Sequence, residues 1–105
     1  MKKITPDKLH SAAERGNIQI IDVREAYEVE SGNIGGLHIP MAEAAERHSE
    51  LRKDVPVVVC CRSGKRAAAV VHFLETEFHF DNLYCLEGGI EAYADLTDAE
   101  ITVYG

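Results

Sequence analysis

Short apolar runs alternate with segments of helical periodicity along the chain. The apolar runs lie at residues 18–23, 37–39, 55–60 and 83–86. Apolar residues also recur at helical spacing from Lys65 to Phe78, and this spacing predicts a helix there. Thr5 and Pro6 are typical of the start of a helix, which we expect to end at Gly16. Strands that alternate with helices predict an α/β fold, in which a parallel sheet is covered by helices on both faces.

Four less regular segments complete the predicted order of elements. Glu25–Glu30 is predicted to form a short acidic helix, and Met41–Leu51, which is rich in Ala and Glu, a second helix. The glutamates of both segments are typical of solvated helix faces. Another short helix is predicted from Gly88 to about Leu96. Ile101–Tyr104 is expected to be either a last strand or a packed tail.

Size, charge and cysteine usage restrict the class of protein. A chain of 105 residues without repeats or an interdomain linker is expected to form one domain, residues 1–105. It has neither a stretch of 18 apolar residues nor an apolar leader, so we expect no membrane partner and no secretion. The net charge of −7 argues against nucleic acid as a partner. Three cysteines, two of them adjacent, favour a reducing cytoplasm over a disulfide framework.

The loop after the run at 55–60 carries the most reactive candidate group, the thiol of Cys61. A helix N-terminus or nearby cations can lower the pKa of a cysteine from about 8.5 to between about 3.5 and 7.5. We expect both a helix N-terminus and cations near Cys61, because three cations and a glycine follow it and a helix begins near residue 63 or 64. The candidate loop comprises Cys61, Arg62, Ser63, Gly64, Lys65 and Arg66. Cys60 continues the strand and Cys85 lies within another, so we expect both to pack.

Polar or glycine-rich segments follow three of the predicted strands. They are Asp22-Val23-Arg24, Cys60-Cys61-Arg62 and Glu87-Gly88-Gly89. In parallel sheets, ligands bind at the carboxyl ends of the strands. We therefore expect the three segments to border one pocket, with Asp22 and Arg24 paired in a supporting role. The five histidines do not have the spacing of a zinc site, so no metal is expected.

Four motifs in order resemble the single-domain rhodaneses, which are sulfurtransferases of the thiosulfate type. The motifs lie at residues 20–25, 31–40, 61–66 and 86–90 and so extend over most of the chain. The resemblance implies a rhodanese-like α/β fold with a central parallel five-stranded sheet and helices on both faces. It also implies that Cys61 is the catalytic cysteine, that Arg62 to Arg66 complete a six-residue active-site loop, and that Asp22 and Arg24 brace this loop.

The same resemblance implies sulfur transfer through a cysteine persulfide, without a metal or organic cofactor. The Cys61 thiolate would take the outer sulfur of a small anionic donor such as thiosulfate. The acceptor would be cyanide in an assay, and a thiol or a sulfur-carrier protein in a cell. Loop N–H groups would hold the transferred sulfur, and Arg62, Lys65 and Arg66 would attract the donor.

Three other interpretations stay open at the level of the sequence. Cys60 and Arg66 have the spacing of a phosphatase-type loop, although Gly64 then lies one place late and Ala67 replaces a hydroxyl. The domain could instead be a non-catalytic or regulatory binding module whose loop does not turn over. A dithiol site of Cys60 and Cys61 is disfavoured, because adjacent cysteines fit ordinary disulfide geometry poorly.

Overall fold

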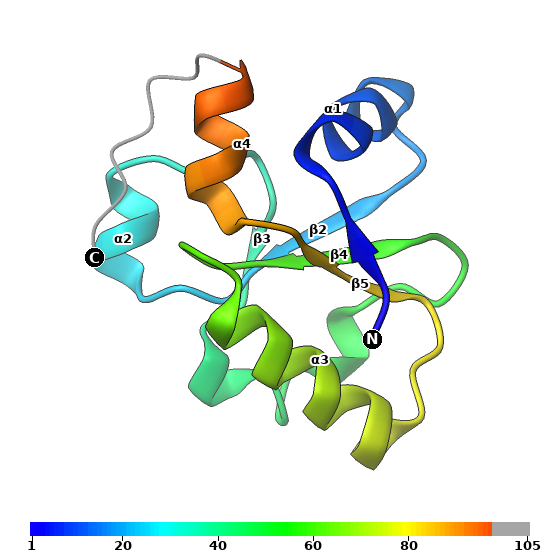
Figure 1. Ribbon diagram of the computed structural model, residues 1–105. Helices are drawn as coiled ribbons and strands as arrows, with labels where there is room; N and C mark the ends of the chain where they lie inside the picture. Colours follow the sequence, from blue (N-terminus) through cyan, green and yellow to red (C-terminus); the bar gives the residue numbers. More distant parts are fainter. Residues whose placement is uncertain (98–105) are drawn as a thin grey trace.

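Five short parallel strands form the middle layer of the molecule, with helices packed on both faces (Figure 1). The computed structural model describes residues 1–97. The strands are β1 (Lys3–Ile4), β2 (Gln19–Asp22), β3 (Leu37–His38), β4 (Val57–Cys60) and β5 (Leu83–Leu86). The helices are α1 (Pro6–Arg15), α2 (Ala26–Glu30), α3 (Lys65–Phe78) and α4 (Gly89–Thr97), with 3-10 turns η1 (Met41–Glu43) and η2 (His48–Glu50).

The order of the strands in the sheet is β1-β5-β4-β2-β3, and every neighbouring pair is parallel. This arrangement confirms the predicted α/β class and the five-stranded parallel sheet. β4 is the central strand, and all four of its residues are buried. Its register with β2 places Cys60 opposite Asp22. The end of β4 therefore lies beside the end of β2, where the sequence analysis expects the site.

Alternation along β4 divides the core into two clusters, one on each face of the sheet. Val57 and Val59 face the cluster that includes the apolar stripe of α3. Val58 and Cys60 face the opposite cluster, which Leu9 of α1 and Ile90 of α4 complete. Cys61 belongs to the α3 cluster. The two adjacent cysteines thus lie on opposite faces of the sheet, as expected for successive residues of a strand.

Helix ends follow the sequence signals closely. Thr5 is the N-cap of α1 with Pro6 in the first turn, and Gly16 ends the helix in the left-handed conformation at φ +76°. Glu25 and Glu28 form a capping box at the start of α2, which satisfies backbone donors that a short helix would otherwise leave exposed.

The structure corrects one expectation about an individual element and adds one strand that the sequence did not predict. Residues 41–51 do not form one helix but two 3-10 turns, because only Ala44 and Leu51 of this segment are buried and so short an apolar face cannot stabilise a full helix. The fifth strand is β1 at Lys3–Ile4, a two-residue pairing with β5 that carries no periodic signal. Ile101–Tyr104 lies outside the described residues. Within residues 1–97, no helix has the length and apolar character needed to cross a bilayer.

Candidate active site

The loop between β4 and α3 wraps around the sulfur atom of Cys61. Backbone N–H groups of Gly64 and Ala67 donate to Cys61 Sγ at 3.1 and 3.3 Å. Gly64 turns the chain at φ +110°, a conformation that side chains rarely allow, and brings its own N–H toward the sulfur. Cys61 is 1% exposed, so the protein encloses its thiol nearly completely.

The position of the loop explains why such a sulfur can carry negative charge. Ala67 lies in the first turn of α3, whose free N–H groups form the positive end of the helix dipole. Two N–H donors from this turn and its N-cap therefore point at Cys61 Sγ, an arrangement that favours negative charge on a sulfur atom. The arrangement resembles an oxyanion hole in which sulfur replaces oxygen.

Arg66 is held by a carboxylate from α2. Its guanidinium donates to both Glu28 oxygens, at 2.6 and 3.0 Å, and Glu28 is only 2% exposed. The hydrogen bond from Arg66 lowers the pKa of Glu28, and in turn Glu28 raises the pKa of Arg66. The expectation that the glutamates of this segment lie on a solvated helix face is wrong for Glu28, which is buried. The positive charge of Arg66 is therefore largely balanced by Glu28.

Arg62 has a comparable partner on the other side of the loop. Its Nη2 donates to Glu91 of α4 at 3.0 Å, in a pair whose side chains are 36% and 45% exposed. No sequence pattern pointed to Glu28 or Glu91, because each lies about 30 or more residues from its arginine. Lys65 and Ser63 are exposed, and Lys65 has no carboxylate partner among residues 1–97.

Asp22 and Arg24 form a buried ion pair at the end of β2. Arg24 Nε and Nη2 donate to the Asp22 carboxylate at 2.9 to 3.2 Å, and Nη2 also donates to the Gly32 carbonyl at 2.7 Å. His38 Nε2 donates to the Arg24 carbonyl at 2.7 Å. Both charged side chains are at most 1% exposed. The Arg24 side chain thus connects the end of β2 to Gly32, and burial shields the ion pair from solvent.

The segment after β5 closes the other side of the loop. The N–H groups of Ile90 and Glu91 donate to the carbonyls of Cys61 and Arg62, at 2.9 and 3.1 Å. At Gly89, a side-chain Cβ would stand 2.3 Å from the Arg62 carbonyl oxygen, so only glycine permits this approach. The three strand ends grouped by the sequence analysis do lie together, with the Cys61 loop between the other two.

Comparison with known proteins identifies the family of this chain. The rhodanese-like domain family matches residues 5–96, which is most of the chain. The chain belongs to the rhodanese-like family. This confirms the resemblance drawn from the four sequence motifs.

Among its relatives, this rhodanese-like chain is 28% identical over 102 residues to the thiosulfate sulfurtransferase GlpE of Pseudomonas fluorescens, covering 96% of the chain and 92% of GlpE. It is 30% identical over 113 residues to rhodanese-like/PpiC domain-containing protein 12, chloroplastic, of Arabidopsis thaliana. That match covers 99% of the chain but spans only 38% of the plant protein's length. The crystal structure of a rhodanese-related protein from Thermoplasma volcanium superposes with a TM-score of 0.82 at 30% identity, covering 91% and 93% of the two chains.

The other two thiols of the rhodanese-like domain differ from Cys61 in their surroundings. Cys60 is fully buried on the opposite face of the sheet, and burial raises its pKa well above the ordinary value. Cys85 lies on β5 beneath the loop, where Sγ–H contacts the Gly64 carbonyl at 3.7 Å, and burial raises its pKa. This geometry argues against a phosphatase loop or a dithiol site that uses Cys60. Within residues 1–97, no group of acidic, His or Cys side chains could hold a metal.

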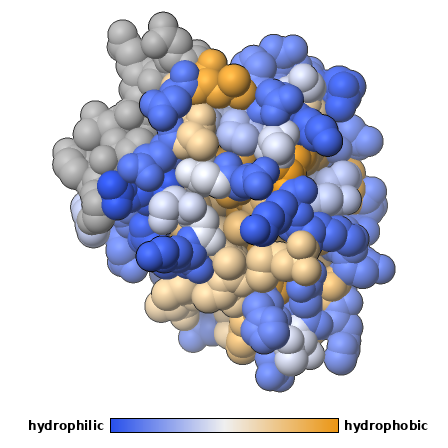
Figure 2. Space-filling model, viewed as in Figure 1, coloured by the Kyte–Doolittle hydropathy of each residue, from blue (hydrophilic) through white to orange (hydrophobic). Residues whose placement is uncertain are grey.

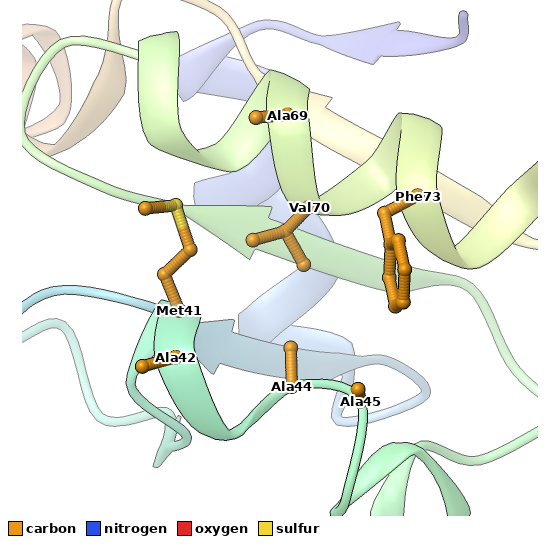
Figure 3. Close-up of a pocket in the computed structure, with 7 residues that line it drawn as sticks. All are labelled: Met41, Ala42, Ala44, Ala45, Ala69, Val70 and Phe73. Atoms are coloured by element: carbon orange, nitrogen blue, oxygen red, sulfur yellow. The ribbon is translucent and has the colours of Figure 1, made fainter.

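An apolar cavity of about 190 Å³ lies between η1 and α3, as Figure 3 shows. Met41 from η1 and Val70 and Phe73 from α3 point into it, and alanines complete its walls. None of the lining side chains is polar, so the cavity offers no group for sulfur chemistry. The Cys61 loop therefore remains the candidate site of this rhodanese-like domain.

Proposed function

We propose that this protein is a sulfurtransferase that moves sulfane sulfur from an anionic donor such as thiosulfate to a thiophilic acceptor, through a persulfide on Cys61. The observation that carries the proposal is the pair of backbone N–H groups that converge on Cys61 Sγ at the start of α3. Donors of this kind favour a charged sulfur both before and after transfer. The GlpE relative, named a thiosulfate sulfurtransferase, supports the choice of donor.

In the first half-reaction, the Cys61 thiolate attacks the outer sulfur of thiosulfate. A new S–S bond forms on Cys61, the S–S bond of thiosulfate breaks, and sulfite leaves with the electron pair. Sulfite is a good leaving group, which thiolate attack on sulfur requires. The protein then holds a persulfide whose terminal sulfur lies near the loop N–H groups.

In the second half-reaction, a nucleophilic acceptor attacks the terminal sulfur and the Cys61 thiolate leaves. With cyanide the product is thiocyanate, and with a thiol or a sulfur-carrier protein the product is a new persulfide. The loop N–H groups stabilise the departing thiolate as they stabilise the attacking one. No step requires a metal or an organic cofactor.

We assign recognition of the donor's charge to Lys65. Of the three loop cations, Arg62 and Arg66 are paired with Glu91 and Glu28, whereas Lys65 has no carboxylate partner among residues 1–97. An unpaired, exposed ammonium attracts an anion more effectively than a neutralised one. Lys65→Gln should therefore raise KM for thiosulfate several-fold with little change in kcat. A fall in kcat at unchanged KM would contradict this assignment.

Replacement of the nucleophile tests the proposal directly. Cys61→Ser should abolish thiocyanate formation from thiosulfate and cyanide, whereas Cys60→Ser should retain it because Cys60 faces the other side of the sheet. Mass spectrometry after thiosulfate treatment should show a gain of about 32 Da, one sulfur atom, on the peptide that contains Cys61. Parental activity of Cys61→Ser would refute the assignment.

The 1% exposure of Cys61 favours a second candidate, a rhodanese-like binding module without turnover. Such a module would form no adduct with thiosulfate and no thiocyanate. The same adduct measurement therefore separates the two functions. We also propose that residues 1–105 act as one domain and, because none of the three thiols is in a disulfide, that the protein resides in the cytoplasm.

A further inference from the structure

A cationic groove lies between α1 and the strands, away from the cysteine loop. It has a volume of about 430 Å³, and its lining residues are Lys3, Ile4, Lys8, Ala12, Arg15, Asn17, Ile18, Pro56 and Tyr84. Pro56 and Ile18 precede β4 and β2, whereas the Cys61 loop follows the other end of β4. The groove is therefore a separate place in the fold and does not depend on the proposed sulfur chemistry.

The charge of this groove is opposite to that of the protein. Lys3, Lys8 and Arg15 line it, and no acidic side chain does, although the chain carries a net charge of −7. Among residues 1–97, these three cations form no ion pair. By contrast, the other arginines all do: Arg24, Arg47, Arg52, Arg62 and Arg66. Of the six lysines and arginines that form no ion pair within residues 1–97, three thus line this one groove of an acidic protein.

Helix α1 separates its charges by face. Lys8, Ala12 and Arg15 follow one another at helical spacing and line the groove. His10 and Glu14, whose side chains approach to 3.2 Å, lie on the side where His10 contacts Tyr93 of α4. Lys8 and Arg15 are seven residues apart, so their backbone positions differ by about 10 Å along the helix axis. Two anionic groups of one small molecule can bridge that distance.

The floor of the groove is apolar and partly aromatic. Ile4, Ile18 and Tyr84 are only partly buried and pack on the core cluster of this sheet face. Figure 2 shows apolar surface in the recess between α1 and the strands, surrounded by hydrophilic side chains. Lys2 adds a further cation, with Nζ 5.5 Å from the centre of the Tyr84 ring. An aromatic surface beneath cations suits a flat ring that carries anionic groups.

We propose that this groove binds an organic anion of nucleotide size, with a flat ring and two or more phosphate groups. The volume falls within the range of about 300–1,000 Å³ that is usual for small-molecule sites. A protein partner would engage about 20–30 residues on each side, whereas nine residues line this groove. The ring would lie on the apolar floor with Tyr84, and the phosphates would contact Lys3, Lys8 and Arg15.

The test is a titration of the full chain with magnesium-free ATP, in which binding is measured by calorimetry and by changes in amide chemical shifts. We expect binding that shifts the amide signals of Ala12, Ile18 and Tyr84. Lys8→Gln should weaken binding about fivefold, a value typical of one charge contact at a partly solvated site. The matched control is Lys53→Gln, which removes an exposed lysine outside the groove and should leave the affinity unchanged.

Two further probes separate the ring from the charge. Inorganic tripolyphosphate should bind more weakly than ATP, and Tyr84→Leu should weaken ATP binding while leaving tripolyphosphate binding unchanged. Equal affinity for ATP and tripolyphosphate, an equal effect of Lys8→Gln and Lys53→Gln, or tighter binding of a hexaglutamate peptide would each overturn the proposal. None of these measurements uses sulfur transfer, so they remain informative if the proposed function fails.

Discussion

The ion pair between Glu28 and Arg66 should contribute measurably to folding. Replacing Glu28 by Gln preserves the shape of the side chain but removes its charge. The carboxylate is 2% exposed and accepts two short hydrogen bonds from Arg66, at 2.6 and 3.0 Å. Breaking a buried pair costs about 3–5 kcal/mol. Since the Arg66 side chain is 32% exposed and can regain water, we expect Glu28→Gln to cost about 2 kcal/mol.

The matched control is Glu91→Gln on the other side of the loop. This substitution also removes a carboxylate from a loop arginine, but the pair is 36% and 45% exposed, so the expected cost is below about 1 kcal/mol. Urea unfolding of the three proteins measures both values. Equal costs would refute the reasoning, because the Glu28 pair is more buried than the Glu91 pair and has two hydrogen bonds where the Glu91 pair has one.

Acid should reduce the difference in the free energy of unfolding between the wild type and Glu28→Gln. The hydrogen bond from Arg66 lowers the pKa of Glu28 in the folded state. The pair's contribution is therefore complete above the ordinary glutamate pKa of about 4.3 and is lost as the pH falls through the lower folded-state value. Urea unfolding at pH 7 and below pH 4 measures this change. A constant difference across that range would contradict the assignment of the effect to the Glu28 charge.

Three further outcomes are expected. Gly89→Ala should destabilise by more than about 2 kcal/mol in urea unfolding, since the new Cβ meets the Arg62 carbonyl at 2.3 Å. Gly16→Ala, at a similar φ but with open space, should cost only about 1 kcal/mol, and a larger cost there would argue against the clash. Cys60 should resist iodoacetamide at pH 8 until the protein unfolds, as peptide mapping would show, because burial raises its pKa and hides it. Val58→Ala in the central strand should cost about 2 kcal/mol by the same unfolding assay, and a cost near zero would show that the site repacks freely.

Local signals in the sequence were sufficient for most elements. The helix from Lys65 to Phe78 and the strand at 83–86 have the predicted bounds, because each carries a strong periodic or continuous apolar pattern. The segment from Met41 to Leu51 does not form the predicted helix. Its Ala and Glu residues favour a helix in isolation, yet few of its side chains reach the core and the chain settles into two short turns.

By itself, the sequence determined the order of the elements, the sheet class and the cysteine that leads the loop. Those properties depend on residues close together in the chain. Only the tertiary structure decided which loop cation remains unpaired, because Arg62 and Arg66 meet carboxylates 29 and 38 residues away. Alternation along β4 placed Cys60 and Cys61 on opposite faces, and the fold of the following loop aimed two backbone N–H groups at Cys61. Long-range contacts carry no local pattern, and so the charge of this site is a property of the fold.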